Sequence, residues 1–381
     1  MEMKDKIATV FAEKFGKPAG TFYASAGRIN LIGEHTDYNE GYVFPGAIDK
    51  VIMAEIRPNG TDKVRVFSID IDEYAEFGLE EKDAPSQSWA RYIFGICREI
   101  IKRGGTVKGF DTVFAGNVPL GAGLSSSAAL ESCFAFGLND MFNDNKIDKF
   151  ELAKIGQSTE HNYCGVNCGI MDQFASVFGK KDHLIRLDCR DLSYEYFPFA
   201  PKGHKLVLID SRVKHELKDS PYNKRRESCE RVAKALGVKS LRDVSLAELN
   251  AARIGFSDED YRRAKYVIEE KDRVLTVCAA LERGDYDEVG KMMYETHEGL
   301  SKDYEVSCEE LDFLANLAKE CGVTGSRIMG GGFGGCTINL VPDSLHDGFI
   351  ATAKEKFNAK YGHEPMVYDV IISDGARRLE D

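Results

Sequence analysis

The chain has 381 residues, 43% of them hydrophobic and 29% charged, with a formal net charge of −12 at pH 7. This length allows two domains, each with its own core, and the acidic balance argues against a nucleic-acid binder, which normally carries a basic face. We find no apolar run of about 18 residues and no apolar leader segment, so we expect a cytoplasmic protein that does not bind membranes.

Hydrophobic periodicity predicts alternating strands and helices in the first half of the chain. The first predicted helix covers residues 4–16, and strands are predicted at Tyr23–Leu31, Ala47–Arg57, Lys63–Ile69 and Phe110–Phe114. Helices are predicted at 88–103, 124–142 and 149–163, and two further strands at His183–Asp188 and Lys205–Asp210.

The second half is predicted to be mostly helical from residue 223 to residue 319, where Glu, Lys, Arg and Ala are frequent and proline is rare. A glycine-rich segment that ends in a strand follows at Gly325–Leu340. A helix at Leu345–Tyr361 and a strand at Met366–Ile372 then complete the pattern. Early strands and later helices predict an α+β architecture of two domains, divided near Pro198–Gly203.

The most informative segment covers residues 116–130 and has the sequence GNVPLGAGLSSSAAL. Gly121 and Gly123 allow a tight turn and the close approach of a ligand, and the serines at 125–127 precede a predicted helix. Because a helix start favours anions, this pattern predicts a phosphate site with hydroxyl groups for a metal ion, although it is not a Walker A loop. Serines that only cap the helix, or a dinucleotide fingerprint completed by Asp140, remain alternatives.

A second segment, Gly27–Asn39, joins a short apolar strand to a cluster of polar side chains. These are Glu34, His35, Asp37 and Asn39. Carboxylates and amides suit sugar hydroxyls, each of which donates and accepts hydrogen bonds, although a polar turn would have the same composition. Arg28 lies inside the apolar run, so it must be paired with an acid or bind an anion.

The third segment, Glu160–Gln173, contains two candidate carboxylates. Glu160 ends a helical stretch and could bind Mg²⁺. Asp172 has apolar neighbours, which suits a general base, but it could instead cap the helix that follows. Cys164 and Cys168 have no second pair with zinc spacing, so we expect reduced cysteines rather than a metal site.

The fourth segment contains a glycine run that matches the dinucleotide fingerprint literally, with Gly330, Gly332 and Gly335 in the required positions. The predicted strand Cys336–Leu340 follows it, whereas the fingerprint requires a helix there. The run therefore indicates a close approach of the backbone to a phosphate or a sugar.

Together the four segments resemble the galactokinases of the GHMP kinase family over nearly the whole chain. Gly27–Asn39 is similar to the galactokinase signature, Pro119–Ala129 to the family's nucleotide loop and Gly330–Cys336 to its third glycine-rich motif. Asn167–Gln173 is similar to the segment that carries the catalytic aspartate.

The resemblance implies a two-domain GHMP kinase fold with the active site in the cleft between the domains. Residues 1–200 are expected to form an N-terminal domain with a mixed sheet and helices. Residues 201–365 are expected to form a helix-rich C-terminal domain with an antiparallel sheet, and the final strand, 366–381, to return to the N-terminal domain.

The implied reaction is phosphorylation of the C1 hydroxyl of α-D-galactose by MgATP. Asp172 is then the proton acceptor, Arg28 keeps it ionised and neutralises the transferring phosphoryl group, and Ser127 and Glu160 match the Mg²⁺ positions. The implied sugar-contacting residues are Glu34, His35, Thr36, Asp37, Gly169 and Tyr222. The implied ATP-binding residues are Ser68, Trp89, Gly121, Ala122, Gly123, Leu124, Ser125, Ser126 and Ser127.

Two positions depart from the family pattern. Ala26 stands where the family usually has proline, which frees φ there, and Met329 stands where it usually has threonine. Neither change affects the base, the metal residues or the sugar-contacting run, so we expect an active kinase that is a monomer or a weak homo-oligomer. A kinase for N-acetylgalactosamine, galacturonate or arabinose, a non-catalytic galactose sensor and a dinucleotide oxidoreductase are the alternatives.

Overall fold

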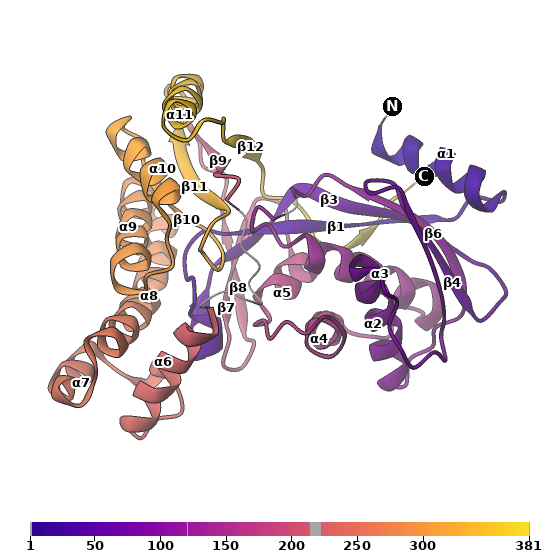
Figure 1. Ribbon diagram of the computed structural model, residues 1–381, viewed down its shortest axis with the longest axis horizontal. Helices are drawn as coiled ribbons and strands as arrows, with labels where there is room; N and C mark the ends of the chain where they lie inside the picture. The colour runs from indigo at the N-terminus through magenta and orange to yellow at the C-terminus, as the bar shows by residue number, and fades with distance from the viewer. Residues whose placement is uncertain (1, 120, 214–221, 381) are drawn as a thin grey trace.

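Two groups of elements, one around a six-stranded sheet and one around a four-stranded sheet, form the two ends of the molecule (Figure 1). The computed structural model describes residues 2–119, 121–213 and 222–380. In spatial order, the strands of the larger sheet are β13 (Arg377–Arg378), β1 (Thr21–Asn30), β3 (Pro45–Pro58), β6 (Phe110–Gly116), β4 (Lys63–Ser68) and β5 (Glu73–Gly78). Because β4 and β6 run parallel while the other neighbours run antiparallel, this sheet is mixed.

Helices cover both faces of the six-stranded sheet, which explains why its inner strands are buried along nearly their whole length. Figure 1 shows α1 (Met3–Phe15) on one side and, on the other, α2 (Ser88–Lys102), α3 (Ser126–Asn143), α4 (Lys149–Thr159) and α5 (Met171–Phe178). Side chains alternate between the faces of a strand. Phe22 therefore packs in the cluster under α1, whereas the adjacent Tyr23 packs against Phe136 of α3.

The four-stranded sheet is antiparallel throughout. Its order is β10 (Gly325–Ile328), β11 (Cys336–Pro342), β9 (His204–Asp210) and β12 (Met366–Val370). The helices of this half are α6 (Tyr222–Ala235), α7 (Leu246–Ala251), α8 (Asp258–Glu282), α9 (Tyr286–Glu298), α10 (Glu309–Glu320) and α11 (His346–Tyr361). A third sheet, of β2 (Tyr42–Val43), β7 (His183–Asp188) and β8 (Tyr194–Pro198), lies between the two ends in Figure 1.

The expected α+β class, with a mixed sheet in one half and helices with an antiparallel sheet in the other, is confirmed. The expectation that 366–381 returns as one strand to the N-terminal part is wrong for its first residues. Val367 pairs with Ile209 of β9 and packs in the apolar cluster there, whereas Arg377 pairs with Ala24 of β1. The segment therefore joins both sheets. The boundaries 1–200 and 201–365 remain a prediction.

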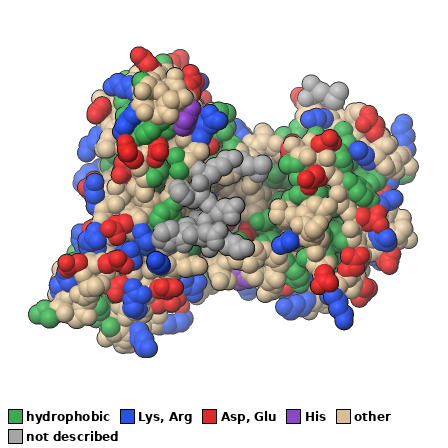
Figure 2. All heavy atoms as spheres, viewed as in Figure 1, with side chains coloured by type: hydrophobic (Ala, Val, Ile, Leu, Met, Phe, Trp, Pro, Cys, Tyr) green, Lys and Arg blue, Asp and Glu red, His purple; other side chains and the backbone are tan. Residues whose placement is uncertain are grey.

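Charged side chains of both signs are interspersed over both lobes of the face drawn in Figure 2. This distribution agrees with a chain whose acidic and basic residues are mixed rather than gathered into a basic surface. Within the described ranges, no helix is long and apolar enough to cross a membrane.

Candidate active site

Arg28 and Asp172 form an ion pair where three segments converge. Arg28 Nε donates to Asp172 Oδ1 at 2.8 Å, and Arg28 Nη1 donates to the Gly123 carbonyl at 2.5 Å. The loop before α3 packs directly on β1, because a Cβ at Gly27 would lie 2.7 Å from the Leu124 carbonyl oxygen. The Arg28 side chain is 5% exposed and that of Asp172 is 30% exposed, so a ligand can reach the carboxylate.

Asp172 lies in the first turn of α5, where the sequence left open whether it caps the helix. Its side chain makes no cap hydrogen bond. Instead Oδ2 accepts from Ser125 Oγ at 2.5 Å. Ser125 has φ 56° and ψ 52°, a left-handed conformation that is uncommon for a residue other than glycine and often marks a functional site. The alternative in which Ser125 only caps α3 is also wrong, because its side chain bonds to Asp172.

A pocket beside this ion pair, which we call the first pocket, gathers most of the residues predicted to contact sugar. Its lining residues are Arg28, Glu34, His35, Asp37, Cys168, Gly169, Met171, Asp172, Tyr222, Gly330 and Gly331. A Cβ at Gly169 would lie 1.9 Å from Asp37 Oδ2, so only glycine allows that carboxylate to approach. Burial, together with the charges of Asp172 and Glu34, raises the pKa of Asp37 to about 6.

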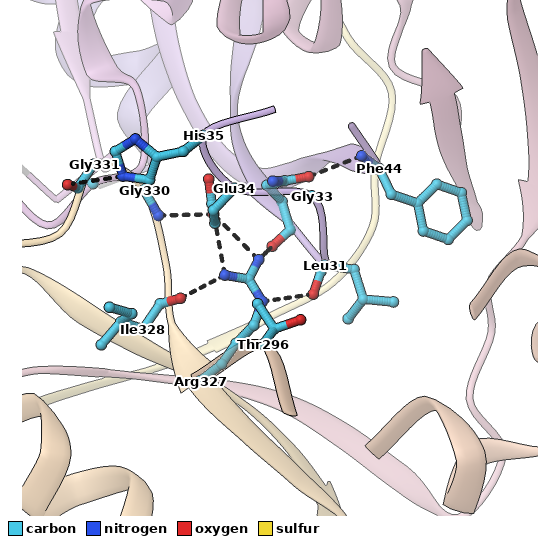
Figure 3. A network of polar contacts seen from close by, with 12 residues as sticks. Leu31, Gly33, Glu34, His35, Phe44, Thr296, Arg327, Ile328, Gly330 and Gly331 are labelled. Atoms are coloured by element: carbon cyan, nitrogen blue, oxygen red, sulfur yellow. Dashed lines mark hydrogen bonds and ion pairs between the residues drawn. The ribbon is translucent and has the colours of Figure 1, made fainter. Parts of the chain in front are cut away.

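Glu34 is held by a network that extends across the two halves of the molecule (Figure 3). Its Oε1 accepts from both terminal nitrogens of Arg327, each at 3.2 Å, and from the Gly330 N–H at 2.8 Å. Within the described residues, the hydrogen bonds that fix this carboxylate all arrive at Oε1. The second oxygen is therefore free to accept from a ligand in the first pocket.

His35 is held as a neutral ring. Burial lowers its pKa to about 3. Its Nε2 lies 3.2 Å from the Gly331 carbonyl, which can only accept, so Nε2 carries the proton. Nδ1 then accepts from the Tyr38 hydroxyl at 2.7 Å, and the Tyr222 ring lies 5.3 Å from the imidazole between centroids. The first pocket thus combines carboxylates with aromatic rings.

A second pocket lies on the other side of the ion pair. It is lined by Arg28, Pro119, Gly121, Gly123, Leu124, Ser125, Ser126, Ser127, Asp172, Val213, Met329, Gly330, Gly331, Gly332, Gly334 and Gly335. The two glycine loops face each other across it, because a Cβ built at Gly335 would meet Ala122 at 3.7 Å. Backbone N–H groups at the start of α3 and the hydroxyls of its serines suit phosphate oxygens. Arg28, Asp172, Gly330 and Gly331 line both pockets.

Buried carboxylates near Ser127 fit a divalent cation. Glu160 lies in a π-helical turn, η2 (Glu160–Cys164), and burial raises its pKa to about 7 although a hydrogen bond with Ser127 favours its charged form. Burial and the charge of Glu160 likewise raise the pKa of Glu131 well above its usual value. Glu131 Oε1 is buried without a hydrogen-bond partner in the described structure. A cation would stabilise the charged forms of these two acids. Two carboxylates are enough for Mg²⁺, which usually takes only one or two from the protein.

Five of the predicted site residues line neither pocket, and one of them is Glu160, described above. The Thr36 hydroxyl lies within hydrogen-bonding distance of the Gly33 and Tyr42 carbonyls, so it serves the turn. Ala122 belongs to the loop before α3, and its side chain is fully buried in the core. The tilted ring of Trp89 lies 5.6 Å from that of Phe114 between centroids, and Ser68 pairs with the same residue, so these two lie together beside the C-terminal end of β6.

Sequence reasoning missed Arg327, Cys168 and Met171. Arg327 is fully buried, and an arginine in the apolar strand before the glycine run is the same signal that pointed to Arg28. No sequence pattern pointed to Cys168 or Met171, because a thiol or a thioether that only lines a pocket wall has no charge or strong hydrogen-bonding group to mark it. Burial raises the pKa of the Cys168 thiol well above its usual value.

Three family signatures match the chain. The galactokinase galactose-binding signature matches residues 9–58, the GHMP kinase N-terminal domain residues 91–180 and the GHMP kinase C-terminal domain residues 278–359. The galactokinase of Thermotoga petrophila is 42% identical over 93% of this chain and 98% of its own length. The chain belongs to the galactokinase family. The galactokinase of Clostridium beijerinckii agrees, at 40% identity over 100% of both chains.

Solved structures support the same family. The crystal structure of Lactococcus lactis galactokinase complexed with galactose superposes with a TM-score of 0.94 at 33% identity, covering 99% of this chain and 100% of that one. The mevalonate kinase of Methanococcus jannaschii, at 15% identity and a TM-score of 0.68 over 94% of this chain and 100% of its own, shares the fold. As a galactokinase-family member, the chain is a sugar kinase of the GHMP type.

Proposed function

We propose that this chain transfers the γ-phosphoryl group of ATP to the C1 hydroxyl of α-D-galactose, with Asp172 as the base and Arg28 as the charge-neutralising group. The observation that carries the proposal is that one ion pair lines both pockets. One pocket offers acceptors and rings suited to a sugar, and the other offers N–H groups and hydroxyls suited to phosphates. The reacting atoms of both substrates therefore meet at Arg28 and Asp172.

Asp172 accepts the proton of the C1 hydroxyl as that oxygen bonds to the γ-phosphorus and the bond to the departing ADP breaks. Two hydrogen bonds to Asp172, from Arg28 Nε and from Ser125 Oγ, fix the plane of the carboxylate before the sugar arrives. Arg28 also neutralises charge on the transferring group. Phosphoryl transfer depends mainly on alignment and charge neutralisation, and this arrangement supplies both.

Ser127 and Glu160 are the residues that would hold Mg²⁺ beside the phosphates. The support is the Ser127 hydroxyl, which favours the charged form of the Glu160 carboxylate, together with the burial of that carboxylate and the unpartnered oxygen of Glu131 nearby. When bound, Mg²⁺ offsets the negative charge of the β- and γ-phosphates. Ser126 and the N–H groups at the start of α3 complete the phosphate contacts, with Ser68 and Trp89 assigned to the nucleoside end.

In the first pocket, Glu34, Asp37 and the Gly169 backbone contact the sugar hydroxyls. The free oxygen of Glu34 and the carboxylate of Asp37 accept hydrogen bonds from them. Tyr222 and His35 supply the apolar edge on which the sugar ring lies. The tight approach of Gly169 to Asp37 supports a pocket shaped for one small sugar rather than an open groove.

The test is ADP release measured with galactose, N-acetylgalactosamine, galacturonate, arabinose and glucose, each with and without Mg²⁺. We expect galactose to give the highest kcat/KM, and activity to require Mg²⁺. Another sugar with a higher kcat/KM would replace galactose as the substrate. ADP release with none of them, alongside measurable galactose binding, would indicate a sensor instead of a kinase.

A further inference from the structure

Two adjacent side chains of the first pocket contact one turn of the glycine loop. The Gly330 N–H donates to Glu34 Oε1 at 2.8 Å, and His35 Nε2 donates to the Gly331 carbonyl at 3.2 Å. This turn lines the second pocket as well as the first. A movement of the turn toward phosphates therefore moves the hydrogen-bond partners of Glu34 and His35.

Arg327 ties this arrangement to the end of β1. In Figure 3 its guanidinium lies among Glu34, Leu31 and Ile328. Its Nε donates to the Leu31 carbonyl at 2.8 Å, Nη1 to the Ile328 carbonyl at 2.5 Å, and Nη2 to the Asn30 carbonyl. Both terminal nitrogens also donate to Glu34 Oε1.

The geometry of these bonds requires a guanidinium. Arg327 is fully buried and belongs to β10 of the four-stranded sheet, whereas Leu31 follows β1 of the six-stranded sheet. A planar guanidinium presents five N–H donors in fixed directions, and a lysine ammonium cannot reach the same acceptors. The contact therefore fixes one half of the molecule against the other at the wall of the first pocket.

A second buried carboxylate, Glu270, fixes the backbone just before Glu34. Glu270 Oε1 accepts from the Gly33 N–H at 2.7 Å, and its Oε2 accepts from Arg273 Nε and the Thr296 hydroxyl. The backbone before Glu34 is thus fixed from α8. Arg327 fixes the side chain.

We propose that Arg327 is a positioning residue that holds Glu34 and the Gly330–Gly331 turn in one arrangement, so that sugar binding and nucleotide binding are energetically coupled. This inference rests on the proposed function. A nucleotide that orders the glycine loop also orders the acceptor that receives the sugar, and the reverse holds by thermodynamic reciprocity. Arg327 is fully buried and lines neither pocket, so its role is to position other groups.

The test measures galactose binding by calorimetry in Arg327→Lys, with and without Mg²⁺ and a non-hydrolysable ATP analogue. In the wild type we expect the analogue to tighten galactose binding. In Arg327→Lys we expect galactose affinity to fall by about ten- to a hundredfold, and the analogue to lose its effect. Arg57→Lys is the matched control, because Arg57 pairs with the buried Asp111 far from both pockets, and it should keep wild-type affinity and coupling.

Circular dichroism establishes whether Arg327→Lys is folded. If it is not, Tyr38→Phe provides the second measurement, because it removes the hydroxyl that holds His35 while keeping the ring. We expect about a two- to tenfold loss of galactose affinity and weaker coupling, with Tyr294→Phe, whose hydroxyl donates to Val323, unchanged.

The outcomes separate this inference from the proposed function. A wild type that binds galactose and phosphorylates it, with a folded Arg327→Lys that has unchanged affinity and coupling, would overturn the positioning role alone. An analogue that leaves galactose affinity unchanged in the wild type would also overturn it. A wild type that binds no galactose would overturn the proposed function first.

Discussion

Arg28 Nε and Asp172 Oδ1 lie 2.8 Å apart although 144 positions separate the two residues in the chain. The pair joins β1 to α5, and the second Arg28 contact, to the Gly123 carbonyl, adds the loop that precedes α3. An ion pair that only stabilised the fold would not need to line two pockets. Here the same two side chains line both the first pocket, whose groups suit a sugar, and the second pocket, whose groups suit phosphates.

Replacement of Ser125 separates the two properties of that position, its hydroxyl and its strained backbone. Ser125→Ala and Ser125→Gly both remove the hydrogen bond to Asp172 Oδ2, so we expect kcat to fall about ten- to a hundredfold in each. Glycine adopts the left-handed conformation without strain, so Ser125→Gly should be more stable than Ser125→Ala by about 1 kcal/mol.

Steady-state kinetics and urea unfolding of the two Ser125 variants check this prediction. If Ser125→Ala and Ser125→Gly were equally stable, the backbone at Ser125 would not be strained. An unchanged kcat in both variants would contradict the role of the Ser125 hydroxyl.

The Asp37 carboxylate is predicted to cost stability at neutral pH. Its folded pKa, raised by burial from 3.8 to about 6, lies above the unfolded value, so the native state binds more protons between those pH values and its stability falls as pH rises through them. Asp37→Asn should therefore be more stable than wild type by about 1–3 kcal/mol at pH 8, and nearly equal to it at pH 4. Its galactose affinity should decrease.

Denaturant unfolding at both pH values measures the Asp37 effect, with Asp62→Asn as the exposed control. A stability difference between Asp37→Asn and wild type that does not depend on pH would contradict the raised pKa of the Asp37 carboxylate.

Gly169 is predicted to determine access to the first pocket. A Cβ there would lie 1.9 Å from Asp37 Oδ2, so Gly169→Ala must displace that carboxylate. We expect the KM for galactose to rise by about ten- to a hundredfold, while the KM for ATP changes little. Gly255→Ala is the matched control, because a Cβ at Gly255 meets no atom within 4 Å. Kinetics with an unchanged galactose KM would remove Asp37 from the sugar contacts.

Local sequence patterns predicted most elements of the fold. The strand at His183–Asp188 has the predicted bounds, and the helix predicted at Leu345–Tyr361 begins one residue later, because apolar spacing and flanking polar residues mark both clearly. β5 and β8 were missed, since each is largely exposed and carries little apolar periodicity. The position of β12 could not be predicted either, because strand pairing across the chain depends on which apolar faces remain uncovered.

The candidate site was only partly accessible to sequence reasoning. The four motif segments contain most of the residues that line the two pockets, since glycine runs and polar residues after strands are local signals. The contact between Ser125 and Asp172, and the Arg327 network on Glu34, join positions far apart in the chain. Such contacts follow from the packing of whole elements, and no local pattern of residues reveals them.

Asp172→Asn, assayed for turnover and galactose binding on the same sample, tests the central claim most directly. The amide keeps the size of the carboxylate and an oxygen that accepts from Arg28, so the variant should fold and bind galactose as the wild type does. It lacks the proton acceptor, so kcat should fall by about 10²–10⁴-fold. A folded Asp172→Asn with kcat near that of the wild type would contradict the account.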